Sequence, residues 1–198
     1  MPSSRDVYIV GAARTPLGAF QGSLSHHSAT DLGAIAIEAA VERASVPPTA
    51  VEEVYFGNVC SAGLGQAPAR QAAIKAGLPT SADCTTVNKV CASGMKSVCF
   101  GAQAISLGQS DIVVVGGMES MSNIPFICKS MRSGTRMGDA SLSDIMIADC
   151  LWDSFENVHM GECAGKCATA ESLFGSRERT KNTRDRSLCV CSLNCARF

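Results

Sequence analysis

Cys91 is the residue of this sequence whose setting best suits covalent chemistry. It lies in the segment NKVCASGMK, residues 88–96, where a β-branched run meets a helical pattern over residues 92–107. At the first turn of a helix, unpaired N–H groups and the helix dipole favour an anion. The sequence therefore predicts a thiolate at Cys91, which is the nucleophilic form of cysteine. Because the helix is apolar on all sides, we expect it to be buried, with only its first turn reaching a cleft.

A second role is common for the same residue type. A free cysteine is among the most buried residues in proteins and usually acts as a small hydrophobic side chain. The predicted position at a helix terminus leaves both interpretations of Cys91 open at this point.

The predicted elements around Cys91 alternate between strands and helices. Strands are expected at residues 7–13, 54–59, 85–87 and 111–117, and helices at 68–76, 92–107 and from Thr30, the predicted N-cap, toward Pro47. The order β-α-β-α-β-α-β predicts an α/β fold with a layered, mostly parallel sheet. The uninterrupted apolar run at 111–117 is typical of a central strand that is covered on both faces.

The chain divides into three predicted regions. Residues 1–123 form the α/β domain, and the irregular residues 124–167 begin a lid or loop domain. Residues 168–198 carry six Lys and Arg against three Asp and Glu, and we expect this basic, cysteine-rich tail to be disordered. A zinc site is an alternative for the late cysteines, but their spacing matches no common zinc module, so we expect no metal. These cysteines are Cys163, Cys167, Cys189, Cys191 and Cys195.

The composition of the whole chain narrows the class of protein. Its 198 residues are 46% hydrophobic and 18% charged, with a net charge of −1, which is typical of a soluble α/β protein and favours neither nucleic acid nor a membrane as partner. Eleven cysteines without the framework of a small secreted protein indicate a reducing compartment. With no leader pattern at the start, we expect a cytoplasmic protein, and the mitochondrion is the alternative.

Five motifs occur in an order that resembles a known family. They are GAARTP at 11–16, GNV to GQAPARQ within 57–71, NKVCASGMK at 88–96, GGMESMS at 116–122 and HMGECA at 159–164. With these motifs the chain resembles the thiolase family, and within it the acetyl-CoA acetyltransferases. The resemblance implies a thiolase-like layered fold, of which this chain holds the N-terminal βαβαβαβ half, followed by a divergent tail.

The resemblance also implies a reaction and its residues. Cys91 matches the family's acyl-accepting nucleophile, which takes an acetyl group from acetyl-CoA for Claisen condensation to acetoacetyl-CoA or for the reverse thiolysis, a reaction of lipid metabolism. Leu151, His159 and Met160 match positions that contact CoA. Met118 and Glu119 are expected to act first as structural support. No cofactor is implied, since the CoA thioester is the substrate, and family members are dimers or tetramers.

Two alternatives remain beside this reading. In the family, the catalytic Gly-His-Pro, Cys-x-Gly and Asn-Glu-Ala-Phe motifs lie in a C-terminal half that this chain does not match. The chain is therefore alternatively a truncated, non-catalytic thiolase isoform with an apolar helix face left exposed. The loop GLGQAP at 63–68 also lies between a predicted strand and a helix, as a dinucleotide-binding loop does. Pro68 stands at the third glycine position of that pattern and weakens a nicotinamide-binding oxidoreductase reading.

Overall fold

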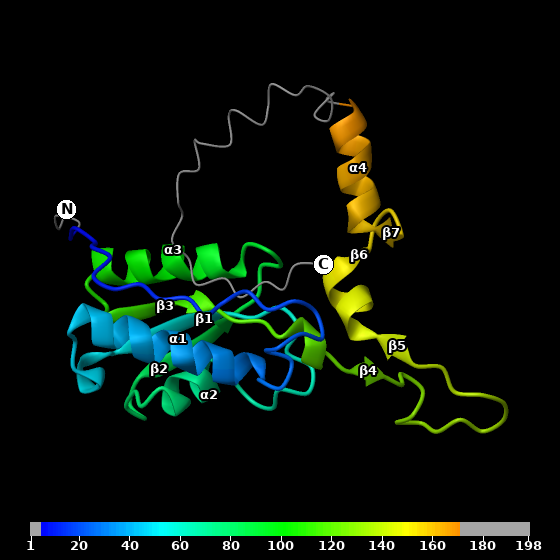
Figure 1. The fold of residues 1–198 in the computed structure, drawn as a ribbon, viewed down its shortest axis with the longest axis horizontal. Coiled ribbons are helices and arrows are strands. Elements are labelled where there is room, and N and C mark those ends of the chain that lie inside the picture. Colours follow the sequence, from blue (N-terminus) through cyan, green and yellow to red (C-terminus); the bar gives the residue numbers. More distant parts are fainter. Residues whose placement is uncertain (1–4, 171–198) are drawn as a thin grey trace. The chain divides into compact units, whose positions relative to one another are not determined.

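A parallel sheet of three strands organises the first part of the chain (Figure 1). The structure is a computed structural model that describes residues 5–170. The strands are β1 (Glu53–Gly57), β2 (Asp83–Val87) and β3 (Val113–Gly117), and their order is β2-β1-β3. Gly57 lies opposite Val87 on one side and Gly117 on the other, so the three strands end level with one another.

Helices cover both faces of this sheet, as the alternating pattern predicted. The helix α3 (Ser93–Ser106) packs on β1 and β3 from one side, and α1 (Ala29–Ala44) and α2 (Pro68–Lys75) pack together on the other (Figure 1). A short 3₁₀ turn, Pro48–Ala50, leads from α1 toward β1. The predicted α/β layering and parallel pairing are thus confirmed.

The hydrophobic core lies between the sheet and the pair α1 and α2. Phe56, Ile37 and Val54 are its largest fully buried side chains. The core cluster consists of Ala29, Ile37, Val41, Val51, Val54, Phe56, Ala69, Ala72, Ala73, Leu78 and Met118. Met118 comes directly after β3, so the core extends up to the edge of the sheet where the strands end.

The predicted strand at residues 7–13 is wrong for the described structure. This segment is extended but belongs to no sheet, and its side chains at Tyr8, Ile9 and Val10 are 67–77% exposed. It runs along an apolar hollow of about 150 Å³ that separates it from Val113, Val114 and Val115. Because no strand lies within hydrogen-bonding reach, an apolar and β-branched sequence alone does not form a ladder here.

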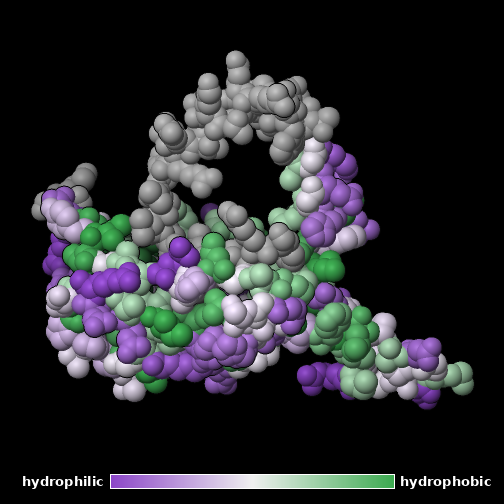
Figure 2. All heavy atoms as spheres, in the orientation of Figure 1, coloured by the Kyte–Doolittle hydropathy of each residue, from purple (hydrophilic) through white to green (hydrophobic). Residues whose placement is uncertain are grey.

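Two expectations about burial also need correction. The strand β3 is at the edge of the described sheet, and β1 takes the central place, because β3 pairs with β1 alone. The helix α3 is buried only on the side of its small residues, such as Gly94, Ser97 and Gly101, whereas Met95 and Cys99 are exposed. Hydrophobic residues come to the surface over α3 and the N-terminal segment (Figure 2).

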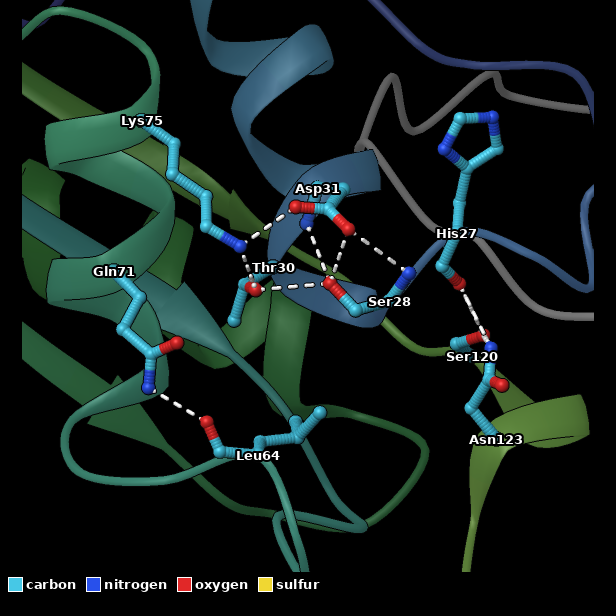
Figure 3. A network of polar contacts seen from close by, with 9 residues as sticks. All are labelled: His27, Ser28, Thr30, Asp31, Leu64, Gln71, Lys75, Ser120 and Asn123. Carbon is cyan, nitrogen blue, oxygen red and sulfur yellow. Dashed lines mark hydrogen bonds and ion pairs between the residues drawn. The ribbon is translucent and has the colours of Figure 1, made fainter.

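The N-cap of α1 lies two residues earlier than the predicted one, Thr30. Ser28 is the N-cap: its hydroxyl accepts from the Asp31 N–H at 3.2 Å, while an Asp31 carboxylate oxygen accepts from the Ser28 N–H at 3.1 Å. Lys75 then reaches from α2 to both Thr30 and Asp31, at 2.8 and 2.6 Å (Figure 3). Thr30 is therefore a link between two helices rather than a cap.

Residues 126–170 form a second, separate unit with short elements. These are β4 (Phe126–Ile127), β5 (Ser143–Asp144), a π-helical turn (Met146–Leu151), β6 (Trp152–Asp153), β7 (Val158–His159) and α4 (Met160–Ala170). Large hydrophobic side chains lie at its surface around β4 and β5 (Figure 2). The predicted tail, 168–198, lies outside the described residues except for 168–170, which end α4. Within 5–170 no helix is long and apolar enough to cross a bilayer.

Candidate active site

The candidate active site lies where the three parallel strands end. Each strand is followed within two residues by a polar side chain: Asn58 after β1, Asn88 after β2 and Glu119 after β3. A hollow of about 50 Å³ opens at this edge. Its lining residues include Gly57, Asn58, Val59, Val90, Cys91, Gly94 and Glu119. The carboxyl ends of strands are the usual place for ligands in α/β folds.

Cys91 lies on the wall of this hollow, immediately before α3. The helix begins at Ser93 and its N-cap is Ala92, so Cys91 stands one residue ahead of the N-cap rather than inside the first turn. Its side chain is exposed, and the interpretation of Cys91 as a buried hydrophobic residue is therefore wrong. The thiol is open to a reagent at the end of a helix whose dipole favours an anion.

The backbone before Cys91 adopts an unusual conformation that side chains hold in place. Val90 has φ +48°, which a β-branched residue rarely adopts. Its N–H donates to Oδ1 of Asn88 at 3.0 Å, and its carbonyl accepts from the Ser93 hydroxyl at 2.6 Å. The same Ser93 oxygen accepts from the Lys89 N–H at 2.8 Å. Both backbone groups of Val90 are thus fixed, so the turn presents Cys91 in one defined way.

Small residues allow α3 to begin directly against the strand ends. A Cβ atom at Gly57 would come within 2.8 Å of the Gly94 nitrogen and of two carbon atoms of Ser93. A Cβ atom at Gly117 would likewise have backbone atoms of Gly57 and Gly94 as its nearest neighbours. This contact of backbone with backbone places the amino end of α3, and Cys91 ahead of it, at the carboxyl ends of β1 and β3.

Glu119 ties the loop after β1 to the end of β3. One carboxylate oxygen accepts from the Val59 N–H at 2.8 Å and the other from Nδ2 of Asn58 at 2.9 Å. The Cys60 N–H lies 3.3 and 3.4 Å from the two oxygens. Burial raises the pKa of Glu119, and these donors act against that rise. The arrangement agrees with the structural role that the sequence suggested for Glu119.

The three predicted CoA-contacting residues lie together in the second unit. His159 pairs with Trp152 across β6 and β7, Leu151 directly precedes Trp152, and Met160 directly follows His159. His159 Nδ1 accepts from the Gly161 N–H at 3.1 Å, which engages one ring nitrogen of the imidazole. Cys91 belongs to the other unit, so its role and theirs stay separate predictions.

The glycine loop after β1 does not have the character of a phosphate-binding loop. Gln71 fills it: its Nε2 donates to the carbonyl oxygens of Leu64 and Gln66, both at 2.7 Å (Figure 3 shows the first). The helix α2 begins at Pro68, which has no N–H to offer an anion. These contacts argue against a nicotinamide-binding site at this loop. In the described part of the chain, no three His, Cys, Asp or Glu side chains gather where they could hold a metal ion.

Asn58, Asn88 and Ser93 were not predicted from the sequence as residues of the site. A signal for the first two was present, since each is a polar residue that follows directly after an apolar or β-branched run. In a parallel sheet such residues meet at one edge. Ser93 gave no signal, because a serine near a predicted helix start is usually its N-cap and here it supports the turn before the helix.

Known proteins are similar to this chain in both sequence and fold. A family model described as the N-terminal domain of thiolase matches residues 7–181. Acetyl-CoA acetyltransferase 2 of Arabidopsis thaliana is 61% identical over 164 residues, which cover 83% of this chain and 41% of that protein. A cytosolic acetyl-CoA acetyltransferase of Gibberella zeae is 55% identical over 167 residues, 84% of this chain and 42% of that one.

A solved structure agrees with these likenesses. The Acat5 thiolase of Ascaris suum, in complex with coenzyme A, superposes with a TM-score of 0.81 at 45% identity, and the match covers 85% of this chain and 44% of that one. The thiolase-like α/β fold predicted from the motifs is confirmed. The chain spans less than half of the length of the relatives it matches.

Proposed function

The chain belongs to the thiolase family, and on that premise we propose that Cys91 accepts an acetyl group from acetyl-CoA. The observation that carries the proposal is the position of Cys91: exposed, at the wall of a hollow at the strand ends, and directly before the amino end of α3. An ionised sulfur at that position is favoured by the helix dipole, and it is the form that attacks a thioester.

The first step is an exchange of one thioester for another. The Cys91 sulfur attacks the acetyl carbonyl carbon and a tetrahedral intermediate forms, in which the carbonyl electron pair rests on oxygen. When the carbonyl reforms, the bond to the CoA sulfur breaks, and CoA leaves as a thiolate that takes up a proton. The Cys91 backbone N–H is the proposed donor for the transient oxyanion, because the N–H groups of Ala92 and Ser93 already donate to the Lys89 and Val90 carbonyl oxygens at 3.1 and 3.0 Å.

The second step forms a carbon–carbon bond. A base removes a proton from the α-carbon of a second acetyl-CoA, and the resulting carbanion attacks the acetyl carbon on Cys91. Acetoacetyl-CoA leaves and the Cys91 thiolate returns, so atoms and charge balance. None of the three histidines lies in a Gly-His-Pro segment, so the proposal names no histidine as the base of this step.

The remaining features of the proposal follow from the same resemblance. Leu151, His159 and Met160 contact CoA, and the substrates are acetyl-CoA and acetoacetyl-CoA, with no cofactor or metal required. The protein acts in the cytoplasm, as the name of the Gibberella zeae relative states for that enzyme, with the mitochondrion as the alternative. A homo-oligomer, dimer or tetramer, is its proposed assembly.

Intact-mass spectrometry of the purified chain after mixing with acetyl-CoA tests the first step. We expect a mass gain of one acetyl group in the wild-type chain and in Cys99→Ser, but none in Cys91→Ser. Cys99 is the matched control, because it is a second exposed cysteine and lies on α3, the helix that Cys91 precedes. Equal acetylation of Cys91→Ser and wild type would overturn the proposed role.

The second candidate function is acceptance of the acetyl group without condensation, favoured by the absence of a Gly-His-Pro and an Asn-Glu-Ala-Phe segment from these 198 residues. Assaying acetoacetyl-CoA in the same mixture separates the two. Acetylation of Cys91 together with acetoacetyl-CoA supports full turnover. Acetylation without it supports a chain that completes only the first half of the reaction.

A further inference from the structure

We propose that Glu119 is a positioning residue for Cys91, acting through Val59 and Asn88 on the strained turn at Val90. The proposal deepens the proposed function, since it concerns the same nucleophile, but it rests on geometry that is independent of the substrate. Glu119 lies on the wall of the Cys91 hollow without reaching the turn itself.

The connection begins at the end of β3 and crosses to β1. Glu119 accepts from the N–H of Val59 at 2.8 Å, which fixes the peptide that follows Asn58. Nδ2 of Asn58 donates to the other oxygen at 2.9 Å and also lies 3.3 Å from the Met118 carbonyl oxygen. Asn58 is 1% exposed, so this end of the connection is shielded from water. The loop after β1 therefore takes its position from Glu119.

The connection continues from β1 to the turn that follows β2. The carbonyl oxygen of Val59 accepts from Nδ2 of Asn88 at 3.3 Å, and Oδ1 of the same asparagine accepts from the Val90 N–H at 3.0 Å. Both ends of the Asn88 amide are thus engaged, one by each loop. The Val59 backbone is held at its N–H by Glu119 and at its carbonyl by Asn88, so three hydrogen bonds in series join Glu119 to Val90.

The turn needs this support because Val90 has an unfavourable backbone conformation. Its φ of +48° costs free energy for a β-branched side chain, and such a conformation persists only where neighbouring groups fix it. Val90 immediately precedes Cys91, so relaxation of φ at Val90 moves the thiol. Loss of the Glu119 carboxylate releases the Val59 peptide first, then Asn88, and then the turn.

Glutamine at position 119 is the sharpest substitution, because it keeps the shape but replaces one acceptor oxygen with an NH₂ donor. That donor would face an N–H or the Asn58 amide. The matched control is Glu38→Gln, the same change at an exposed position on α1. Asn88 is exposed, so Asn88→Ala breaks the connection at its middle without removing a buried group.

The measurement is the alkylation rate of individual cysteines by iodoacetamide, followed by peptide mass mapping. Cys99, which is exposed on α3, serves as reference within each molecule. We expect Glu119→Gln and Asn88→Ala each to slow alkylation of Cys91 by roughly three- to ten-fold, with Cys99 unchanged. Combining them should add little to either, since both interrupt one connection.

Three results would overturn the proposal. One is a Cys91 rate in Glu119→Gln equal to that in Glu38→Gln. Another is an equal change at Cys91 and Cys99, which would show general loosening. The third is full additivity of the two variants. If wild-type chain is not acetylated by acetyl-CoA but the alkylation pattern holds, the proposed function fails while the positioning role stands.

Discussion

The hydroxyl oxygen of Ser97 accepts from the N–H of Gly116 at 3.0 Å and lies 2.7 Å from the carbonyl oxygen of the same residue. Ser97 is fully buried, and its hydroxyl is also 2.6 Å from the Gly94 carbonyl oxygen. One side chain in the first turns of α3 therefore fastens the helix to β3. The position of Cys91 depends on this attachment, because α3 begins two residues after it.

Replacing Ser97 with alanine tests this attachment. The variant leaves buried backbone groups of Gly116 without the side-chain partner, which costs about 1–3 kcal/mol. We expect a lower urea midpoint with an unchanged slope. Ser106→Ala, at the last residue of the same helix, has no side-chain hydrogen bond within the described residues and should unfold like wild type. Equal midpoints for the two variants would contradict the role of Ser97.

Gly57→Ala is expected to destabilise the fold by about 1–3 kcal/mol, as overpacked sites do. The new methyl group would meet the backbone at Gly94 and Ser93, which cannot move aside as a flexible side chain can. Thermal unfolding followed by circular dichroism gives the measurement. Gly165→Ala is the control, since among the described residues no atom outside its chain neighbours and its own helix backbone lies within 4 Å of the added Cβ. A wild-type melting temperature for Gly57→Ala would show that the close approach has no energetic weight.

Val90→Gly is expected to stabilise the chain while disturbing the turn. Glycine adopts positive φ without the steric cost of about 1–2 kcal/mol but brings an entropic cost of about 0.5–1 kcal/mol, so a net gain of up to about 1.5 kcal/mol remains. Urea unfolding measures it. Val46→Gly serves as comparison, because the φ of Val46 is not positive, and this variant should lose stability. Similar losses in both variants would mean that Val90 carries no strain.

The ion pair between Lys75 and Asp31 should give stability that disappears in acid. Hydrogen bonds from Lys75 and Ser28 lower the pKa of Asp31 from 3.8 to about 2. Because the folded value is the lower one, ionised Asp31 stabilises the fold above about pH 4, and this contribution is lost as the pH falls toward 2.

Lys75→Met should therefore cost about 0.2–1 kcal/mol at about pH 6 in low salt, the range for exposed pairs. Both side chains are more than two-fifths exposed, so added salt should shrink the loss. Urea midpoints of the two proteins should converge at about pH 2. A difference that stays the same at both pH values would show that the pair is not the source.

Local patterns predicted much of the sheet region. The elements at 54–59, 68–76, 92–107 and 111–117 lie within two residues of β1, α2, α3 and β3, because turn glycines and β-branched runs mark their ends. Cys91 at a helix start could also be predicted from its neighbours. The wrong predictions were a strand at residues 7–13 and a central place for β3. Both concern position in the sheet, which depends on the partner strand rather than on the segment itself.

The supports of the site were harder to predict. Asn58 and Asn88 are far apart in sequence and lie at the same edge of the sheet only because β1 and β2 end level with each other. The strain at Val90 could not be read from a residue type that normally avoids positive φ. Burial of Glu119 and its three donors likewise result from the meeting of two loops, which no local pattern encodes.

Val90 keeps its conformation only while its neighbours stay in place. On gentle heating the segment ahead of α3 should relax before the sheet melts, since its return to ordinary backbone angles releases free energy at once. We therefore expect Cys91 to lose its reactivity at a lower temperature than the one at which the chain unfolds.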